Sequence, residues 1–225
     1  MSDSYSYERR RLVEYLKRAG IIRSRNVEEA FLSIPREQYV PEDLREYAYQ
    51  DTPLPIGSGQ TISAPHMVAI MTEELMVEPN HKILEIGTGS GYQASILAHI
   101  VSKGCGHVYT VERIPELAQN ALINISRAVP HLLEYITIYV GDGSKGLQEF
   151  APYDRIIVTA AAPRILEPLV NQLALEGIMV IPVGNRYEQL LTVVIKDRRG
   201  GISIKQSIPC VFVPLLGEYG WRETR

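Results

Sequence analysis

The residues best suited to chemistry begin with a glycine-rich segment, residues 84–91, whose sequence is LEIGTGSG. Glycine permits tight turns and a close ligand approach because it has no Cβ, and the first N–H groups of a following helix face a bound polar group. Gly91 comes two residues after Gly89, whereas a dinucleotide fingerprint has its third glycine at the position of Tyr92. The segment predicts a cradle for another nucleotide-like ligand, although a plain tight turn would have a similar sequence.

Two carboxylates follow at the ends of two further strand-like segments. Glu112 ends the alternating segment 108–112, about 20 residues past the glycines, where a strand–helix–strand unit places its ribose-binding acid. A carboxylate accepts two hydroxyl hydrogen bonds, so Glu112 suits the 2′,3′-diol of a ribose. Asp142 follows the strand-like segment 136–140 and could accept a hydrogen bond from the exocyclic amine of adenine. Taken alone, Glu112 could be a solvated strand end and Asp142 part of an Asp-Gly turn. Together with the glycines they predict an adenosine-binding site.

These residues need a sheet that brings successive strand ends together. Strand-like and helix-like segments alternate, with strands at 82–86, 108–112, 136–140, 155–159 and 178–183 and helices at 92–101, 115–129 and 165–173. Near-continuous Ile, Val and Leu in these strands indicates a parallel sheet covered on both faces. Segments 189–196 and 202–213 have no helix between them, which predicts an antiparallel pair. We therefore expect an α/β fold with a doubly wound, mostly parallel, Rossmann-like sheet.

The first third of the chain has a different pattern. Helical spacing predicts helices at 8–19 and 65–76, and Asn26 with Glu29 resembles a capping box at the start of a short helix. The segment 33–64 is rich in proline and is expected to be irregular apart from a helical turn at 42–47. A long irregular segment in a compact domain is usually functional, so we expect it to cover the substrate.

Length and composition narrow the functional classes. A chain of 225 residues suits one domain, which we divide into N-terminal helices and covering loop (1–78), cofactor-binding core (79–185) and C-terminal strands and tail (186–225). The absence of long apolar runs and of a secretory leader predicts a cytoplasmic protein without membrane partners. A net charge of −3 argues against a broad basic surface for nucleic acid. The cysteines and histidines lack ligand spacing, so we expect no metal.

The glycine segment with its preceding acid, Glu85, is similar to that of S-adenosylmethionine-dependent methyltransferases. Further blocks of sequence resemble one family among them, the protein-L-isoaspartate (D-aspartate) O-methyltransferases. These blocks are REQYVP at 36–41, TISAPHM at 61–67, VER at 111–113, GDG at 141–143, YDRIIVTA at 153–160 and FVPL at 212–215. TISAPHM and FVPL are far more specific than the glycine segment. Ser58 and the triplet at 175–177 depart from the common pattern of the family. Neither position carries chemistry, so these differences concern only the conformation of loops.

The resemblance implies transfer of a methyl group from S-adenosyl-L-methionine to the free carboxylate of L-isoaspartyl residues in damaged proteins and peptides, with D-aspartyl residues as a further acceptor. S-adenosyl-L-homocysteine would be the product. Ser63 would be the catalytic residue, and the substrate would contact Ile62, Ser63, His66 and Val213. The implied cofactor-binding residues are Glu85, Gly87, Thr88, Gly89, Ser90, Gly91, Glu112, Arg113, Asp142, Gly143 and Thr159.

The chemistry is consistent with this interpretation. A carboxylate with a pKa near 4 is ionised at neutral pH and requires no general base, which fits the lack of an obvious Cys/His or Ser/His/Asp set. Ser63 should orient the carboxylate rather than attack it, although the serine could also serve as a helix cap before Pro65. Residues 160–162 are small and apolar, unlike the polar-Pro-Pro-aromatic tetrad typical of amino-methylating enzymes that act on bases.

Two other functions are compatible with the sequence. The same cradle could serve methylation of an RNA base or a small macrocycle, and a methyl-acceptor screen would separate these acceptors. A donor-binding sensor or scaffold without catalysis would bind the donor but form no methyl ester. The oligomeric state is not predicted, and the tail 218–225 could be free or docked on a neighbouring subunit.

Overall fold

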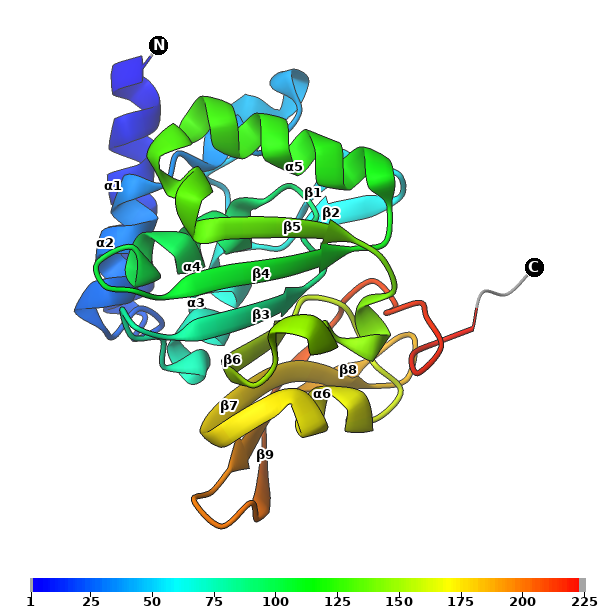
Figure 1. Cartoon of the computed structure of the whole chain (residues 1–225). Coiled ribbons are helices and arrows are strands. Elements are labelled where there is room, and N and C mark those ends of the chain that lie inside the picture. The colour runs from blue at the N-terminus through cyan, green and yellow to red at the C-terminus, as the bar shows by residue number, and fades with distance from the viewer. Residues whose placement is uncertain (1, 223–225) are drawn as a thin grey trace.

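The computed structural model describes residues 2–222, and 223–225 at the end of the tail lie outside the described residues. Its main sheet has seven strands in the order β5-β4-β3-β6-β7-β8-β9 (Figure 1). The strands are β3 (Lys82–Ile86), β4 (His107–Glu112), β5 (Ile136–Val140), β6 (Tyr153–Val158), β7 (Leu173–Gly184), β8 (Gln189–Lys196) and β9 (Ile202–Cys210). The first five pair in parallel, whereas β8 pairs antiparallel with both β7 and β9. The predicted sheet, including its antiparallel pair, is confirmed.

The strand order reverses beside β3, which lies between β4 and β6. In open α/β sheets a ligand binds at such a switch point, outside the carboxyl ends of the strands. Ile86 ends β3 and Val158 ends β6, and these two residues are register partners. The glycine segment and Thr159 therefore leave the sheet side by side.

Helices cover the two faces of this sheet unequally. The α-helices are α1 (Ser2–Arg18), α2 (Arg25–Ser33), α3 (Pro65–Leu75), α4 (Tyr92–Val101), α5 (Pro115–Ala128) and α6 (Glu167–Gln172). Side chains from α1 to α5 form one hydrophobic cluster, and α6 packs in a second cluster with the other face. Short 3₁₀-helices occupy Arg36–Gln38, Glu42–Tyr47, Pro130–Tyr135, Gly143–Lys145 and Gln148–Phe150. Within residues 2–222, no helix is both long and apolar enough to cross a membrane.

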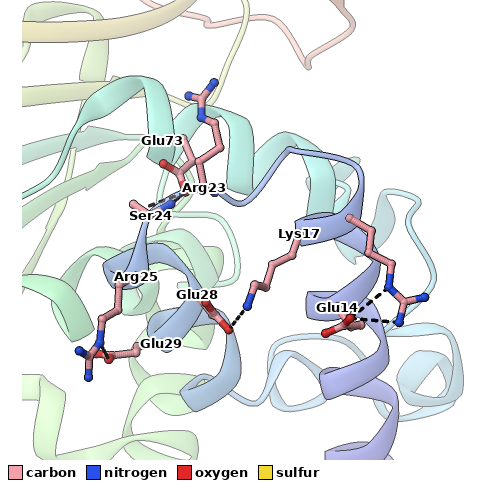
Figure 2. Close-up of polar contacts among 9 residues, drawn as sticks. Glu14, Lys17, Arg23, Ser24, Arg25, Glu28, Glu29 and Glu73 are labelled. Atoms are coloured by element: carbon pink, nitrogen blue, oxygen red, sulfur yellow. Dashed lines mark hydrogen bonds and ion pairs between the residues drawn. The ribbon is translucent and has the colours of Figure 1, made fainter.

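The start of α2 differs from the predicted capping box. Ser24 is the N-cap, and its Oγ accepts a hydrogen bond from Val27 N at 3.3 Å. The carboxylate of Glu73 on α3 accepts from the backbone N–H groups of Arg23 and Ser24 at 2.8 and 2.9 Å (Figure 2). The prediction of Asn26 as the cap was wrong because this contact with α3 fixes the chain two residues earlier.

A β-hairpin interrupts the segment predicted to be irregular. β1 (Leu54–Gly57) and β2 (Gln60–Ile62) pair antiparallel, and Gly57, Ser58 and Gly59 all have positive φ in the connecting turn. The hairpin lies over the glycine segment, since Ile56 Cδ1 would be 3.4 Å from a Cβ built on Gly89. The segment therefore does cover the sheet edge, but as an ordered hairpin.

After β9 the chain returns across the carboxyl ends of the sheet. β9 ends at Cys210 rather than at the predicted residue 213, because Ala161 N donates to Val213 O and Leu215 N donates to Ala161 O, both at 2.8 Å. We call residues 214–222 the C-terminal strap. The strap is docked on the same chain through Glu218 N, which donates to Asp142, and the Trp221 indole, which donates to Ala161 O.

Candidate active site

A cavity opens at the carboxyl ends of β3, β4 and β6, beneath the β1–β2 hairpin and beside the strap. It contains about 1030 Å³ of space free of protein atoms, part of it open to solvent. Eleven of the predicted site residues line it: Ile62, Ser63, Gly87, Thr88, Gly89, Ser90, Glu112, Arg113, Gly143, Thr159 and Val213. The structure thus brings together most of the predicted cofactor-side and substrate-side residues. The remaining four, Glu85, Gly91, Asp142 and His66, lie just outside the lining.

Gly87 occupies a position that tolerates no side chain. Its φ is +98°, and a Cβ there would lie 2.4 Å from Thr159 Oγ1. The Thr159 hydroxyl is 2.7 Å from the Gly87 carbonyl oxygen and 3.0 Å from that of Ile86, so it holds the switch point together. The missing side chain leaves backbone exposed to the cavity, as a cradle for a ligand requires.

The rest of the glycine segment is anchored from behind. Asn124 on α5 donates to Ser90 O at 3.0 Å, and Ser95 donates to Gly91 O at 2.8 Å. A Cβ on Gly91 would lie 3.1 to 3.2 Å from Ile125 and Ala121 of α5. Gly91 therefore allows α4 and α5 to pack closely. Its role is in this packing, and it does not line the cavity.

Glu112 is positioned by two backbone groups. Its Oε2 accepts from Gly89 N at 2.9 Å and its Oε1 accepts from Ile114 N at 3.0 Å. Each carboxylate oxygen keeps a further lone pair, so the side chain can still accept hydrogen bonds from two hydroxyl groups. This geometry fits the ribose diol expected from the sequence.

Glu85 is completely buried behind the cradle. Thr110 Oγ1 donates to Glu85 Oε2 at 2.5 Å and lies 2.7 Å from Thr88 Oγ1. Burial, with a smaller contribution from Glu112, raises the pKa of Glu85 to about 8. Glu85 therefore supports Thr88 through Thr110, and its predicted contact with the cofactor stays a prediction.

Asp142 holds the strap. Its Oδ1 accepts from Ser144 N at 2.9 Å and Ser144 Oγ at 2.6 Å, and its Oδ2 accepts from Glu218 N at 2.8 Å. Gly143, the next residue, lines the cavity and would place a Cβ 2.5 Å from Ile86 Cγ2. The predicted contact of Asp142 with adenine stays a prediction, but the carboxylate already has three donors.

Ser63 lies between the end of β2 and the start of α3. Ala64 is the N-cap of α3, and the side chain that accepts a hydrogen bond from the first turn is that of Asp51 rather than Ser63, so the alternative role of Ser63 as a cap is wrong. The hydroxyl of Ser63 has no hydrogen-bond partner within residues 2–222, although the residue is half-buried and lines the cavity. His66 instead faces Asp51, whose Oδ1 is 2.8 Å from His66 Nδ1 and accepts from His66 N at 2.8 Å.

Several residues of the site were not predicted from the sequence. Tyr92, Gln93, Pro214, Leu215 and Leu216 also line the cavity. Pro214 and Leu215 belong to the FVPL block and Leu216 follows it, so that block was a usable signal for them. The buried side chains of Tyr92 and Gln93 on α4 had no comparable signal in the sequence. Among the described residues, no group of three or more His, Cys, Asp or Glu side chains could hold a metal ion.

The comparison of this chain with known families decides its class. The model of the family Protein-L-isoaspartate(D-aspartate) O-methyltransferase (PCMT) matches residues 7–220. The chain belongs to this family. The resemblance found in the sequence blocks is therefore confirmed over nearly the whole chain.

Individual PCMT-family proteins are similar along their full length. A protein-L-isoaspartate O-methyltransferase from Staphylothermus marinus is 58% identical, covering 99% of this chain and 100% of that protein. One from Pyrococcus horikoshii is 50% identical, with 99% and 100% covered. A Plasmodium falciparum crystal structure described as a PCMT in complex with S-adenosyl-L-homocysteine is 32% identical with a TM-score of 0.83, covering 91% of this chain and 96% of that one.

Proposed function

We propose that this protein transfers a methyl group from S-adenosyl-L-methionine to the free carboxylate of L-isoaspartyl residues in damaged proteins and peptides, leaving S-adenosyl-L-homocysteine. One observation carries the proposal: Ser63, whose hydroxyl has no partner among the described residues, and the glycine cradle line the same cavity. Membership of the PCMT family and the names of its relatives support this acceptor. The product in the related P. falciparum structure supports this donor.

The residues at the switch point fit the donor. Gly87 and Gly89 leave open backbone in the cradle, and Glu112 has acceptor capacity for the ribose hydroxyl groups. Gly143 and Thr159 would form the walls beside them. When bound, the donor supplies an electrophilic methyl group on a sulfonium cation. The protein's contribution is to hold that group at a fixed place beside the acceptor.

On the acceptor side, the chain has to orient a carboxylate that is already ionised. The Ser63 hydroxyl would donate one hydrogen bond to it, while Ile62 and Val213 would contact the substrate backbone. A single neutral donor suits the step, because stronger donation would stabilise the ground-state anion. His66, held by Asp51, would keep the first turn of α3 in place behind Ser63.

The test is incorporation of base-labile methyl groups into an isoaspartyl peptide, with its normal aspartyl twin and transfer RNA as parallel acceptors. We expect methylation of the isoaspartyl peptide alone. Ser63→Ala should lower kcat/KM by about 10- to 100-fold, the value of one hydrogen bond to a charged group. Ser58→Ala, in the exposed turn of the hairpin, is the matched control. Equal labelling of both peptides, or labelling of the RNA, would contradict the proposal.

We also propose the division of the chain made above, with 1–78, 79–185 and 186–225 as parts of one domain of 225 residues. The first part packs against the sheet of the core and the last part supplies strands β8 and β9 of that sheet, which supports one domain. The cytoplasmic location, the acceptance of D-aspartyl residues and the lack of nucleic-acid or membrane partners stay predictions.

A further inference from the structure

Arg36 is a fully buried cation near the active site. Its Nε donates to Ala48 O and its Nη2 donates to Ser63 O, both at 2.8 Å. Its Cζ lies 5.0 Å from the ring centre of Tyr92, which lines the cavity. One guanidinium thus joins the segment before the hairpin, the residue after it and the first residue of α4.

This arrangement is costly for the fold. Within residues 2–222 no carboxylate forms an ion pair with Arg36, and the neighbouring Glu37 pairs with Arg9 at 3.3 Å instead. Arg36 Nη1 is buried and has no hydrogen-bond partner in the described part of the chain. A buried charge without an opposite charge is strongly unfavourable unless its remaining contacts are good. Such a residue is a candidate for a role beyond stability.

The role follows from the position of Ser63 in the chain. The hairpin pairing ends with Leu54 opposite Ile62, and the hydrogen bonds of α3 begin at Ala64 O. Ser63 belongs to neither element, and among the described residues its one hydrogen bond is the one from Arg36. The orientation of the Ser63 peptide group therefore depends on the guanidinium.

We propose that Arg36 is a positioning residue for methyl transfer, which fixes the Ser63 carbonyl and thereby directs the Ser63 hydroxyl into the cavity. The inference rests on the proposed function and on the role of Ser63 in it. The planar guanidinium holds two carbonyls in a fixed relation, which the single ammonium of lysine cannot do. Misplacement of a reacting group by about 1 Å costs about 100-fold in rate.

Arg36→Lys tests the proposal against a matched control, Arg155→Lys. Arg155 is also buried and also donates to two backbone carbonyls, Met76 O at 3.2 Å and Asp154 O at 2.8 Å. It lies near the start of β6, at the opposite end of that strand from Thr159. We expect Arg36→Lys to lower kcat on the isoaspartyl peptide by about 10- to 100-fold while the Kd for S-adenosyl-L-homocysteine changes less than about threefold. Arg155→Lys should leave kcat unchanged.

A double-mutant cycle with Ser63→Ala identifies the route. If Arg36 acts through Ser63, Arg36→Lys should cost less than about threefold in kcat in the Ser63→Ala background. Equal costs in both backgrounds would overturn the inference, as would a loss of product affinity that matched the loss of kcat, since Tyr92 would then be the route. Arg36→Gln gives a second variant if the lysine variant does not fold. Failure of both to fold would assign Arg36 to stability alone and overturn the proposal.

The cycle separates this inference from the proposed function. A wild-type protein that does not methylate the isoaspartyl peptide would contradict the function itself. A wild-type protein that does so, with additive effects of Arg36→Lys and Ser63→Ala, would contradict only the role of Arg36.

Discussion

The backbone N–H of Glu218 lies 2.8 Å from Oδ2 of Asp142, so the C-terminal strap is tied to the loop that follows β5. Lys145 reinforces this contact with an ion pair to Glu218 at 2.6 Å. Between these contacts and β9, Leu215 and Leu216 form one wall of the cavity. Donor affinity should therefore depend on residues that hold the strap but never touch the ligand.

Trp221→Ala tests this dependence. The indole Nε1 donates to Ala161 O at 3.1 Å, and the ring lies 5.2 Å from the guanidinium carbon of Arg186. Loss of both contacts should loosen the wall and raise the Kd for S-adenosyl-L-homocysteine by about 10-fold, measured by calorimetry. Tyr187 is 87% exposed and follows Arg186 in the loop between β7 and β8, so Tyr187→Ala should leave the Kd unchanged. An unchanged Kd in Trp221→Ala would show that the strap does not shape the site.

Glu112→Gln should weaken product binding more strongly. An amide has one acceptor oxygen, so it cannot accept from both Gly89 N and Ile114 N and still bind ribose hydroxyl groups. We expect the Kd to rise by about 10- to 100-fold, the range for a lost hydrogen bond to a charged group. Glu116→Gln, in the first turn of α5, is the control. Similar affinities for the two variants would exclude Glu112 as the ribose acceptor.

Local patterns predicted the parallel part of the sheet because most of its strands are rich in Ile, Val and Leu and lie between turn residues. The bounds of α4, β5 and β8 match the predicted segments 92–101, 136–140 and 189–196. The hairpin was not predicted because β2 has only three residues, too few to show alternation. Ser24 was missed as a cap because Glu73, far away in sequence, decides where α2 begins.

For the site too, residues that act within a short stretch of chain were predicted, and residues that act on a distant segment were not. The cradle and Glu112 were predictable because their functions depend on spacing within one strand–helix–strand unit. Arg36 and Trp221 were not, because each acts on a carbonyl of a distant segment, 27 and 60 residues away. A backbone carbonyl is available at every residue, so no side-chain pattern marks the one that will be used.

Gly87→Ala should disrupt the cradle. The φ of +98° and the 2.4 Å contact with Thr159 Oγ1 should together lower the free energy of unfolding by about 2 to 3 kcal/mol and the donor affinity by more than about 10-fold. Gly200→Ala is the matched control for backbone strain, because its φ is +83° and no atom of residues 2–222 lies within 4 Å of its added Cβ. It should cost about 1 to 2 kcal/mol without affecting affinity.

The steric part of the Gly87 effect can be isolated. Thr159→Ala removes Oγ1, and the nearest remaining Thr159 atom would be its Cβ at 3.7 Å. Gly87→Ala should therefore destabilise the protein less in the Thr159→Ala background than in the wild type, as followed by denaturant unfolding. Additive losses would mean that backbone strain alone is responsible.

Glu85→Gln should change how stability depends on pH. Burial raises the pKa of Glu85 from 4.5 to about 8, so the folded chain keeps a proton that the unfolded chain releases above about pH 4.5. The stabilisation from Glu85 is complete below the unfolded pKa and is lost as the pH rises through about 8. Glutamine resembles the protonated acid and does not ionise. Relative to the variant, the wild type should lose stability steadily between pH 5 and about 8.

Thermal unfolding across this pH range measures the difference, with the exposed Glu134→Gln as the control for loss of an ordinary carboxylate. The control should follow the wild-type curve. Parallel curves for wild type and Glu85→Gln would mean that Glu85 is ionised in the folded protein. A second charge beside Glu112 would then lie under the cradle, and Thr110 would have to donate to an anion rather than to a neutral acid.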